Sequence, residues 1–218
     1  MVIYDCDGVI FDSKKANFEY YSYIFEKFKL PSLDLSDLKI TEVLHTYSND
    51  NVFKYFIKDE QLLSKVIKFS KTVDYSIFYR FMQLEENFFE TCKILKEKNI
   101  LISVATNRSV SFKGIAEYFK LNRFLDDYVT ALNVKNAKPA PDMLLLLLMR
   151  NNLNRDEVVF VGDSEIDLKA AKKAEIDFVG YKFSKKSILT IKNHSELLGC
   201  TVKVPFCKGE YRRIQDIN

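Results

Sequence analysis

The segment VIYDCDGVIFDS, residues 2–13, decides which fold the chain adopts. Val2–Tyr4 is short and apolar throughout, and it is followed at once by Asp5, Asp7 and Gly8. An apolar run without alternation is typical of a strand in a parallel sheet that is buried on both faces. Because side chains alternate along an extended chain, Asp5 and Asp7 are expected on one side of the backbone, beside a sharp turn that Gly8 permits. We therefore predict a buried strand with two carboxylates at its carboxyl end.

Three later segments share this arrangement of an apolar run followed by small or polar residues. The apolar runs are 100–105, 128–130 and 158–161, and the clusters after them are TNRS (106–109), NAKPAP (136–141) and GDSEID (162–167). Helical patterns cover 86–98, 111–119 and 141–151. Alternation of buried strands with helices predicts an α/β fold with a doubly wound parallel sheet of the Rossmann-like type. In such folds the ligand site lies beyond the carboxyl ends of the strands, where each polar cluster falls.

Residues 14–83 interrupt this alternation, because they carry helical patterns and no convincing core strand. We predict an inserted α-helical cap over 14–83 and a discontinuous α/β core made of 1–13 and 84–218. The first cap helix is expected over 14–29, with Ser13 as its N-cap. An aromatic stripe at helical spacing on this helix predicts packing rather than substrate stacking: Phe18, Tyr21, Phe25 and Phe28. A further helix is expected over 60–71, and loops are expected over 31–37 and 48–51.

Composition argues against several classes of protein. The chain has 218 residues, of which 47% are hydrophobic and 29% charged, as is usual for a globular protein. Its 33 basic and 30 acidic residues give a net charge of +3, too balanced to predict nucleic-acid binding. The longest apolar run, 143–149, is too short to cross a membrane. The 4 cysteines form no CxxC pair, which predicts reduced thiols in a cytoplasmic protein without a zinc site or disulfides. The oligomeric state stays open between monomer and homodimer.

The acidic residues at the strand ends predict a metal site. Asp163 and Asp167 lie one helical turn apart after the run at 158–161, so four carboxylates converge if Asp5 and Asp7 end a neighbouring strand. Carboxylates this close repel one another unless a proton or a cation lies between them. Oxygen ligands without His or Cys favour a hard cation, and Mg²⁺ is the usual one where phosphate is handled.

Two further clusters supply groups that bind phosphate. Thr106 and Asn107 offer a hydroxyl and an amide at a strand end, where free N–H groups of the following helix also attract anions. Lys138, in a proline-flanked loop, supplies a positive charge that offsets both the carboxylates and a phosphate. Arg108, beside Asn107, is expected at the surface. A nucleophile, an acid/base, a metal site and a cation together are what phosphoryl transfer requires.

Four motifs, taken together, are similar in order and spacing to the signature motifs of the haloacid dehalogenase-like superfamily. They are DCDGVIFDS (5–13), VATNRS (104–109), NAKPAPD (136–142) and VFVGDSEID (159–167). The resemblance covers residues 1–15 and 84–182, and it is nearest to the helical-cap branch that includes phosphoglycolate phosphatase and β-phosphoglucomutase. The chain departs from the family pattern at Glu85-Glu86-Asn87, where Pro-Gly is usual, and at Ala174-Glu175, where Ala-Gly is usual.

The resemblance implies a role for each motif residue. Asp5 is expected to attack phosphorus and form an aspartyl-phosphate, while Asp7 protonates the leaving oxygen and then activates water. Asp7 is also expected to give its backbone carbonyl to Mg²⁺. The residues implied to surround the phosphoryl group are Gly8, Thr106, Asn107 and Lys138. Asp163 is implied to ligate the metal directly, and Asp167 is implied to lie close by or to act through water or Lys138.

The function expected from these residues is that of a Mg²⁺-dependent phosphatase acting on a small phosphomonoester, phosphoglycolate- or sugar-phosphate-like. A sugar-phosphate mutase would keep every core residue and differ in the cap. A non-catalytic binding protein with the same fold would be favoured by a lost nucleophile or metal ligand, and neither is lost. A dehalogenase is disfavoured by Asp7.

Two parts of the chain gain no role from the resemblance. His45, in the cap, is expected to be structural or exposed rather than catalytic. The segment 188–218 follows the last motif, and alternation over 201–204 is typical of an added edge strand.

Overall fold

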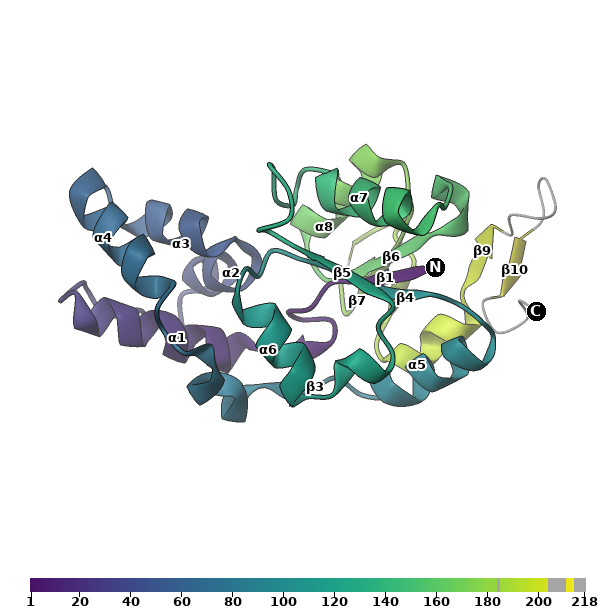
Figure 1. Ribbon diagram of the computed structural model, residues 1–218, viewed down its shortest axis with the longest axis horizontal. Helices are drawn as coiled ribbons and strands as arrows, with labels where there is room; N and C mark the ends of the chain where they lie inside the picture. Colours follow the sequence, from purple (N-terminus) through teal and green to yellow (C-terminus); the bar gives the residue numbers. More distant parts are fainter. Residues whose placement is uncertain (184, 204–210, 214–218) are drawn as a thin grey trace.

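The computed structural model describes residues 1–183, 185–203 and 211–213 of the chain (Figure 1). Its centre is a parallel six-stranded sheet with the order β5-β4-β1-β6-β7-β8. The strands are β1 Val2–Tyr4, β4 Ile102–Thr106, β5 Asp127–Thr130, β6 Val159–Gly162, β7 Asp177–Tyr181 and β8 Thr190–Ile191. The predicted α/β fold with a doubly wound parallel sheet is confirmed.

Strand β1 lies in the middle of this sheet and pairs with β4 on one side and β6 on the other. Val2 lies opposite Ile102 in β4 and Val159 in β6. Strands β4 and β5 extend the sheet on one side of β1, and the chain then crosses to build β6, β7 and β8 on the other. The order therefore reverses at β1, and ligand sites of open α/β sheets form at such a reversal.

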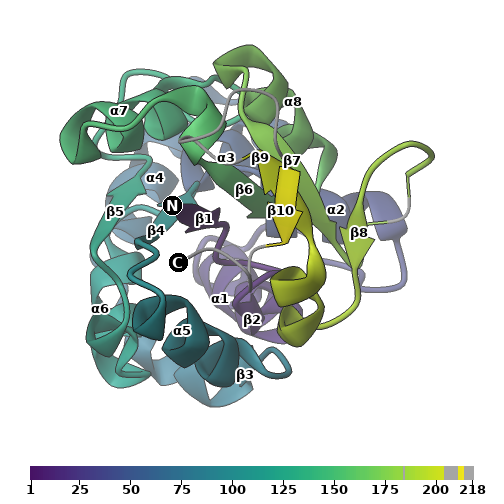
Figure 2. The same cartoon turned by 90° about the vertical axis from the view of Figure 1, so that its right-hand side faces the viewer.

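Two layers of helices cover the sheet, as Figure 2 shows end-on. Helices α7 Asp142–Asn151 and α8 Glu165–Ala174 pack on one face, in an apolar cluster that includes Ile3. Helices α5 Phe88–Glu97 and α6 Ser111–Tyr118 and the 3₁₀ segment η4 His194–Gly199 pack on the other face. Val2, Ile3 and Tyr4 are all buried, as expected for a strand between two helical layers.

The cap is inserted between β1 and β4 and lies beyond the carboxyl ends of the strands (Figure 1). Its elements are α1 Lys14–Lys27, α2 Leu38–Thr46, α3 Asn49–Phe56, α4 Glu60–Ser70 and the 3₁₀ segment η1 Tyr75–Phe81. The chain enters the cap through β2 Phe11–Asp12 and returns through β3 Gln83–Leu84, and these two strands pair antiparallel. The aromatic stripe of α1 packs inside the cap, with Tyr21 edge-on to Phe53 and Phe25 edge-on to Phe56.

Three local expectations differ from the structure. Residues 49–51, expected in a loop, begin α3 instead, with Ser48 at the N-cap position. Ser13 precedes α1 but makes no side-chain cap; its hydroxyl donates to Asp7. The expected edge strand over 201–204 is found as β9 Thr201–Lys203, which pairs with β10 Tyr211–Arg213 in a separate small sheet, and Val204 lies outside the described residues. Strand β8 is instead the segment from this part of the chain that forms an edge of the main sheet, with β5 at the other edge.

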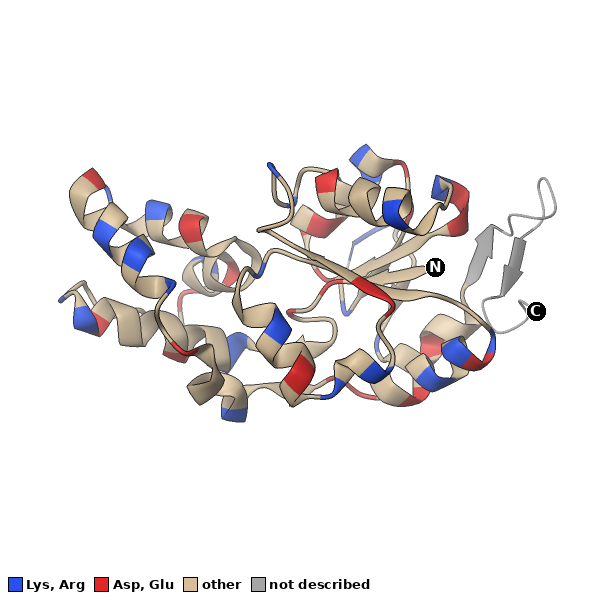
Figure 3. Ribbon diagram, viewed as in Figure 1, with Lys and Arg blue, Asp and Glu red and all other residues tan. Residues whose placement is uncertain are grey.

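Charged residues of both signs are mixed along the helices in the described part of the chain (Figure 3). No helix among the described residues is long and apolar enough to cross a membrane.

Candidate active site

Asp5 is held where β1 meets β6. Its backbone N–H donates to the carbonyl of Val161 at 2.9 Å, and its Oδ1 accepts the N–H of Cys6 at 2.7 Å. The chain then turns back on itself in a loop over residues 6–11. The Cys6 carbonyl accepts the N–H groups of Ile10 and Phe11, and the Gly8 N–H donates to the Phe11 carbonyl at 2.8 Å.

Gly8 is required at the tip of this loop for two reasons. Its φ is +77°, in the left-handed region that favours glycine. A Cβ at this position would lie 1.9 Å from Asp163 Oδ2 and 2.9 Å from His45 Nε2. The sharp turn predicted at Gly8 therefore brings the loop backbone directly against the acidic cluster.

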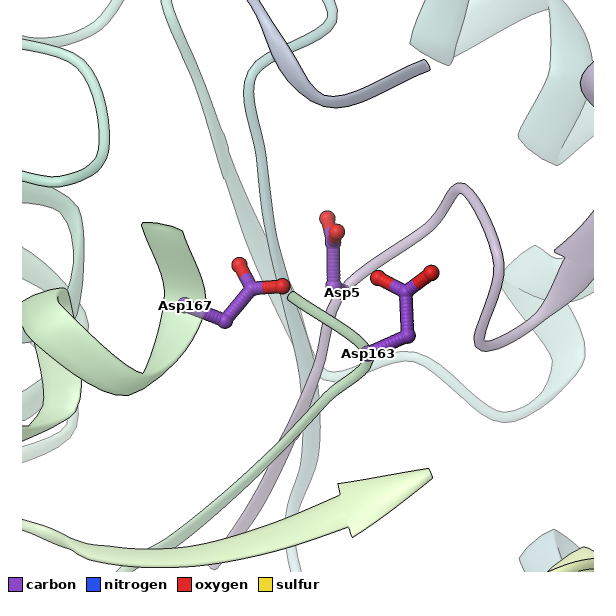
Figure 4. A group of neighbouring side chains, drawn as sticks. All are labelled: Asp5, Asp163 and Asp167. Carbon is purple, nitrogen blue, oxygen red and sulfur yellow. The ribbon is translucent and has the colours of Figure 1, made fainter. Parts of the chain in front are cut away.

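Three aspartates converge at the carboxyl edge of the sheet (Figure 4). Asp5 follows β1, Asp163 follows β6, and Asp167 lies in the first turn of α8. One oxygen of each carboxylate lies within 4.8 Å of the others. The Asp7 carboxylate is not part of this group, since it points to Arg108 and Ser13.

Lys138 lies among these carboxylates. Its side chain is buried, and Nζ lies 2.8 Å from Asp5 Oδ1 and 2.7 Å from Asp167 Oδ1. Burial lowers the pKa of Lys138, but the charges of Asp167 and Asp5 outweigh burial and raise the pKa above its usual value. The Ser164 hydroxyl donates to the other oxygen of Asp167 at 2.5 Å. The predicted lysine therefore stays charged and fixes two of the three carboxylates.

The electrostatics of the acidic cluster favour a cation. Burial is the main cause that raises the pKa of Asp5 to about 7; Lys138 opposes it, and the charges of Asp167 and Asp7 add to it. Burial, followed by the charges of Asp167 and Asp5, raises the pKa of Asp163 well above its usual value. Asp5 and Asp167 are buried and Asp163 is half-buried. The three carboxylates share one lysine and so carry excess negative charge, and their ligand atoms are all oxygen. These residues fit a hard divalent cation.

Thr106 is the last residue of β4 and Asn107 follows it, and both line the same cavity as Asp5. The Thr106 hydroxyl accepts the N–H of Arg108 at 3.1 Å. The Asn107 side-chain amide donates to the carbonyls of Thr46 in the cap and Lys138 in the core, at 3.2 and 3.1 Å. The structure therefore brings both predicted phosphate-binding residues to the site and shows that Asn107 also joins the cap to the core.

Arg108 was expected at the surface, and that prediction is wrong. Only 7% of its side chain is exposed. Its Nη2 lies 2.6 Å from Asp7 Oδ1 and 3.0 Å from both Asn17 Oδ1 and Tyr75 Oη. The Tyr75 ring also lies 4.7 Å from the guanidinium. A sequence pattern on β4 does not show that two cap elements, α1 and η1, cover this position.

His45, expected to be structural or exposed, has a largely buried side chain at the site. Its Nε2 lies 3.7 Å from Asp163 Oδ2, and its Nδ1 lies 3.5 Å from Asn17 Nδ2. Burial lowers the pKa of His45, against the charge of Asp7, which raises it. Asn17, His45 and Tyr75 are among the cap residues that sequence reasoning missed at the site. Asn17 did carry a signal, because it is a polar residue one turn before Tyr20 and Tyr21 on the buried side of α1.

The cap and the core enclose a small cavity of about 50 Å³ above Asp5 and Asp7. Core residues Thr106, Asn107 and Arg108 and cap residues Asn17, Tyr20, Tyr21, His45, Asn49 and Tyr75 line it. A wider cleft of about 520 Å³ shares Asn49, Asn107, Ser109 and Val110 with this cavity and is also lined by Lys138. The space next to the two aspartates is therefore small and polar and has a route outward.

Residues 2–181 match the family described as haloacid dehalogenase-like hydrolase. The chain belongs to this family. A crystal structure of a haloacid dehalogenase-superfamily hydrolase of subfamily IA from Geobacter sulfurreducens is 34% identical, with a TM-score of 0.78, and the match covers 89% of this chain and 95% of that one. One curated relative is a phosphorylated carbohydrates phosphatase of Thermotoga maritima, which is 29% identical over 81% of this chain and 82% of the relative. Another is the pyrophosphatase PpaX of Halalkalibacterium halodurans, which is 23% identical over 83% of each chain.

The family and these relatives make the chain a phosphatase of the haloacid dehalogenase-like type, a phosphoric monoester hydrolase. The resemblance that the four motifs predicted is confirmed. Phosphatases of this family generally use a divalent metal, which agrees with the acidic cluster of Asp5, Asp163 and Asp167.

Proposed function

We propose that the chain is a Mg²⁺-dependent phosphatase that hydrolyses a small phosphomonoester, phosphoglycolate- or sugar-phosphate-like, with Asp5 as the nucleophile. The position of the Asp5 carboxylate supports this most strongly. It lies 2.8 Å from Lys138 Nζ, beside Asp163 and Asp167, and lines the same cavity as Thr106. A carboxylate placed between a fixed cation and polar donors is suited to attack phosphorus, because the surroundings offset the negative charges that meet there.

In the first half of the proposed reaction, a carboxylate oxygen of Asp5 attacks phosphorus and the bond from phosphorus to the leaving oxygen breaks. Asp7 gives a proton to that leaving oxygen. Lys138 offsets charge on the transferred group, while Thr106 and Asn107, with backbone donors near Gly8, hold its oxygens. This half leaves an aspartyl-phosphate on Asp5 and releases an alcohol.

In the second half, Asp7 takes a proton from a water molecule, whose oxygen attacks phosphorus. The bond between phosphorus and the Asp5 oxygen breaks, and the products are inorganic phosphate and the original carboxylate. Asp7 lines the cavity in which the leaving group would lie, and this position supports its role in both proton transfers.

The residues proposed to hold Mg²⁺ are Asp5 and Asp163 through their carboxylates and Asp7 through its backbone carbonyl. Asp167 is proposed to lie close to the ion and to act through water or Lys138. The ion, when bound, supplies positive charge that stabilises the transferring phosphoryl group. Lys138 already binds one oxygen of Asp167 and Ser164 binds the other, which supports an indirect role for Asp167.

Arg108, Asn17 and Tyr75 are proposed to contact the leaving group. Their polar atoms meet next to Asp7 in the cavity, so a group attached to the leaving oxygen lies against them. A buried guanidinium favours an anionic partner, and planar groups such as carboxylate or phosphate suit its geometry. We therefore expect the substrate to be a small phosphorylated metabolite with a second anionic group.

The direct test is hydrolysis of p-nitrophenyl phosphate with and without Mg²⁺. We expect activity that EDTA abolishes and that Asp5→Asn removes, because an amide is not a nucleophile here. Asp177→Asn, an exposed aspartate at the opposite end of the sheet, is the matched control and should keep full activity. Full activity in Asp5→Asn would contradict the proposal. A panel of phosphorylated metabolites that includes inorganic pyrophosphate then identifies the substrate class.

Three assignments from the sequence remain proposals. The cap is taken as 14–83 and the core as 1–13 and 84–218, divided where β2 and β3 pair. A cytoplasmic location is supported by the buried free thiols of Cys6, Cys92 and Cys200, while Cys207 lies outside the described residues. The protein is expected as a monomer or a homodimer, with a small metabolite rather than nucleic acid as its partner.

A further inference from the structure

A buried histidine from the C-terminal part of the chain contacts the loop that carries Asp7 and Gly8. His194 is the first residue of η4, and none of its surface is exposed. Its Nε2 lies 2.8 Å from the carbonyl oxygen of Val9, in the middle of that loop. Since a carbonyl only accepts hydrogen bonds, Nε2 carries the proton and donates it.

Aromatic neighbours fix the orientation of the His194 ring. Tyr181 stacks on it with the ring centroids 4.6 Å apart, and Phe88 and Tyr4 meet it edge-on at 5.0 and 5.5 Å. Burial lowers the pKa of His194 to about 4, so the ring is neutral at ordinary pH. These contacts hold the ring so that its Nε2–H points to the carbonyl oxygen of Val9.

The contacted loop is buried through the side chains of Cys6, Val9, Ile10 and Phe11, but few of its backbone hydrogen bonds reach the rest of the core. Its backbone hydrogen bonds close mainly on themselves, from Ile10 and Phe11 to Cys6 and from Gly8 to Phe11. The His194 bond is one of the few hydrogen bonds that reach the backbone in the middle of the loop from outside it.

The returning chain, beside β3, is held by the same C-terminal region. The Glu86 carbonyl accepts the N–H of His194 at 3.3 Å, and the Glu85 carboxylate accepts the Tyr181 hydroxyl and Lys182 Nζ at 2.9 and 2.5 Å. The Glu85 N–H in turn donates to the Ile10 carbonyl at 2.9 Å. Glu85 and Glu86 are the residues that depart from the family pattern, and the structure shows what they contact. Both chain segments that connect core and cap thus lie close to Tyr181, Lys182 and His194.

We propose that His194 is a positioning residue of the phosphatase reaction. By holding the Val9 carbonyl, it fixes the loop over residues 6–11, and so places Asp7 and Gly8 against the substrate. The proposal rests on the roles given above to Asp7 and Gly8.

His194 differs from an apolar side chain of similar size by its hydrogen bond to Val9 and not by how well it fills the interior. A leucine would pack against Tyr4, Phe88 and Tyr181 without bringing a polar ring into the interior. The imidazole instead leaves its Nδ1 buried without a partner in the described part of the chain. A buried polar atom without a partner lowers stability, so stability alone does not favour histidine here.

The test compares His194→Leu with His194→Gln, which removes the ring but keeps a side-chain N–H donor. We expect His194→Leu to lower kcat for p-nitrophenyl phosphate by about ten- to a hundredfold in the folded enzyme, as displacement of a reacting group by about 1 Å does. His194→Gln should recover part of that loss. Hydrogen–deuterium exchange of the amides of residues 6–11 should be faster in His194→Leu than in the wild type, whether or not the enzyme turns over substrate.

Leu197→Ala is the matched control, since Leu197 is equally buried in the same 3₁₀ segment and lies outside the contact with Val9. It should lower the melting temperature and keep kcat within about twofold, because a cavity costs stability without moving the loop. If His194→Leu behaves like Leu197→Ala, with lower stability but unchanged kcat and unchanged exchange at 6–11, the proposal is wrong. If His194→Leu does not fold, a fully active His194→Met would overturn it equally. Absence of any phosphatase activity in the wild type would instead contradict the proposed function, and the exchange measurement would still decide the role of His194.

Discussion

Arg108 Nη2 lies 2.6 Å from Asp7 Oδ1, and both side chains are almost fully buried between the cap and the core. Burial raises the pKa of Asp7, but other effects outweigh burial and hold this pKa below its usual value. The largest of them is the charge of Arg108, followed by the charge of His45 and by the hydrogen bonds from Arg108 and Ser13. The proposed acid/base is therefore paired with a cation that also faces the leaving group.

This pair predicts substrate selection by Arg108. In Arg108→Gln, kcat/KM for 2-phosphoglycolate should fall by about ten- to a hundredfold more than kcat/KM for ethyl phosphate, because only the first carries a second anion for the guanidinium. Steady-state kinetics on the two substrates measures this ratio. Arg150→Gln, which removes an exposed arginine bonded to Asp127, should leave the ratio unchanged. Equal losses on both substrates in Arg108→Gln would rule out a selective role.

The acidic cluster predicts that Mg²⁺ stabilises the protein more as pH rises. The pKa of Asp5 is about 7 in the folded state, against an ordinary value of 3.8. Without a cation, Asp5 is therefore protonated in the folded protein below about pH 7, and the protein loses stability as the pH rises from about 4 through about 7. Mg²⁺ requires the ionised carboxylates, so protons compete with it at low pH. The gain in melting temperature from Mg²⁺ should be larger at about pH 8 than at about pH 6. Asp163→Asn should reduce this gain, and an equal gain at both pH values in the wild type would contradict the prediction.

Lys138 should matter for stability as well as for activity. Lys138→Met removes the cation shared by Asp5 and Asp167 and leaves both carboxylates buried without it, which should cost about 3–5 kcal/mol of unfolding free energy without Mg²⁺. Part of this loss should return when Mg²⁺ is added. Urea unfolding with and without Mg²⁺ measures both effects. Lys135→Met, an exposed lysine in the same loop, should change stability by less than about 0.5 kcal/mol.

Gly8→Ala should lower both stability and turnover. The added Cβ meets Asp163 Oδ2 and forces a left-handed backbone on alanine, which together should cost about 1–3 kcal/mol. Gly199→Ala provides the control, because a Cβ at Gly199 meets nothing within 4 Å. Denaturant unfolding and p-nitrophenyl phosphate hydrolysis should separate the two variants. A stable and active Gly8→Ala would mean that the loop is free to move away from Asp163.

His194 should contribute to acid sensitivity. Its pKa is lowered to about 4 in the folded chain from an ordinary 6.5, so the unfolded chain binds the proton first, and stability is lost as pH falls from about 6.5 toward 4. The loss attributable to His194 should approach about 3 kcal/mol at the acid end of this range. His194→Gln, which does not titrate, should show a smaller fall in unfolding free energy between about pH 7 and pH 5. Identical pH dependence in the two proteins would contradict the assignment.

The core of the site could be predicted from local sequence because its residues all follow strands of one parallel sheet. Asp5, Thr106 and Asp163 each come at the end of an apolar run, Lys138 lies in the loop that follows β5, and the carboxyl ends of parallel strands meet at one edge. Their convergence therefore follows from the strand pattern alone, without knowledge of how the helices pack. The apolar runs themselves reflect burial on both faces, so the same residues predicted the fold.

Only the tertiary structure decided which other residues reach that edge. Asn17, His45 and Tyr75 lie on three different cap elements, and their positions depend on how the cap helices pack against one another and over β4. Arg108 and His194 are buried by segments far away in the chain, so no local pattern distinguishes them from surface residues. Burial of a polar side chain is a property of non-local packing, whereas hydrophobic periodicity is local. The sequence by itself therefore determined the fold and the acidic centre of this phosphatase, and the packing of cap and C-terminal segment determined the surroundings of its leaving group and of its catalytic loop.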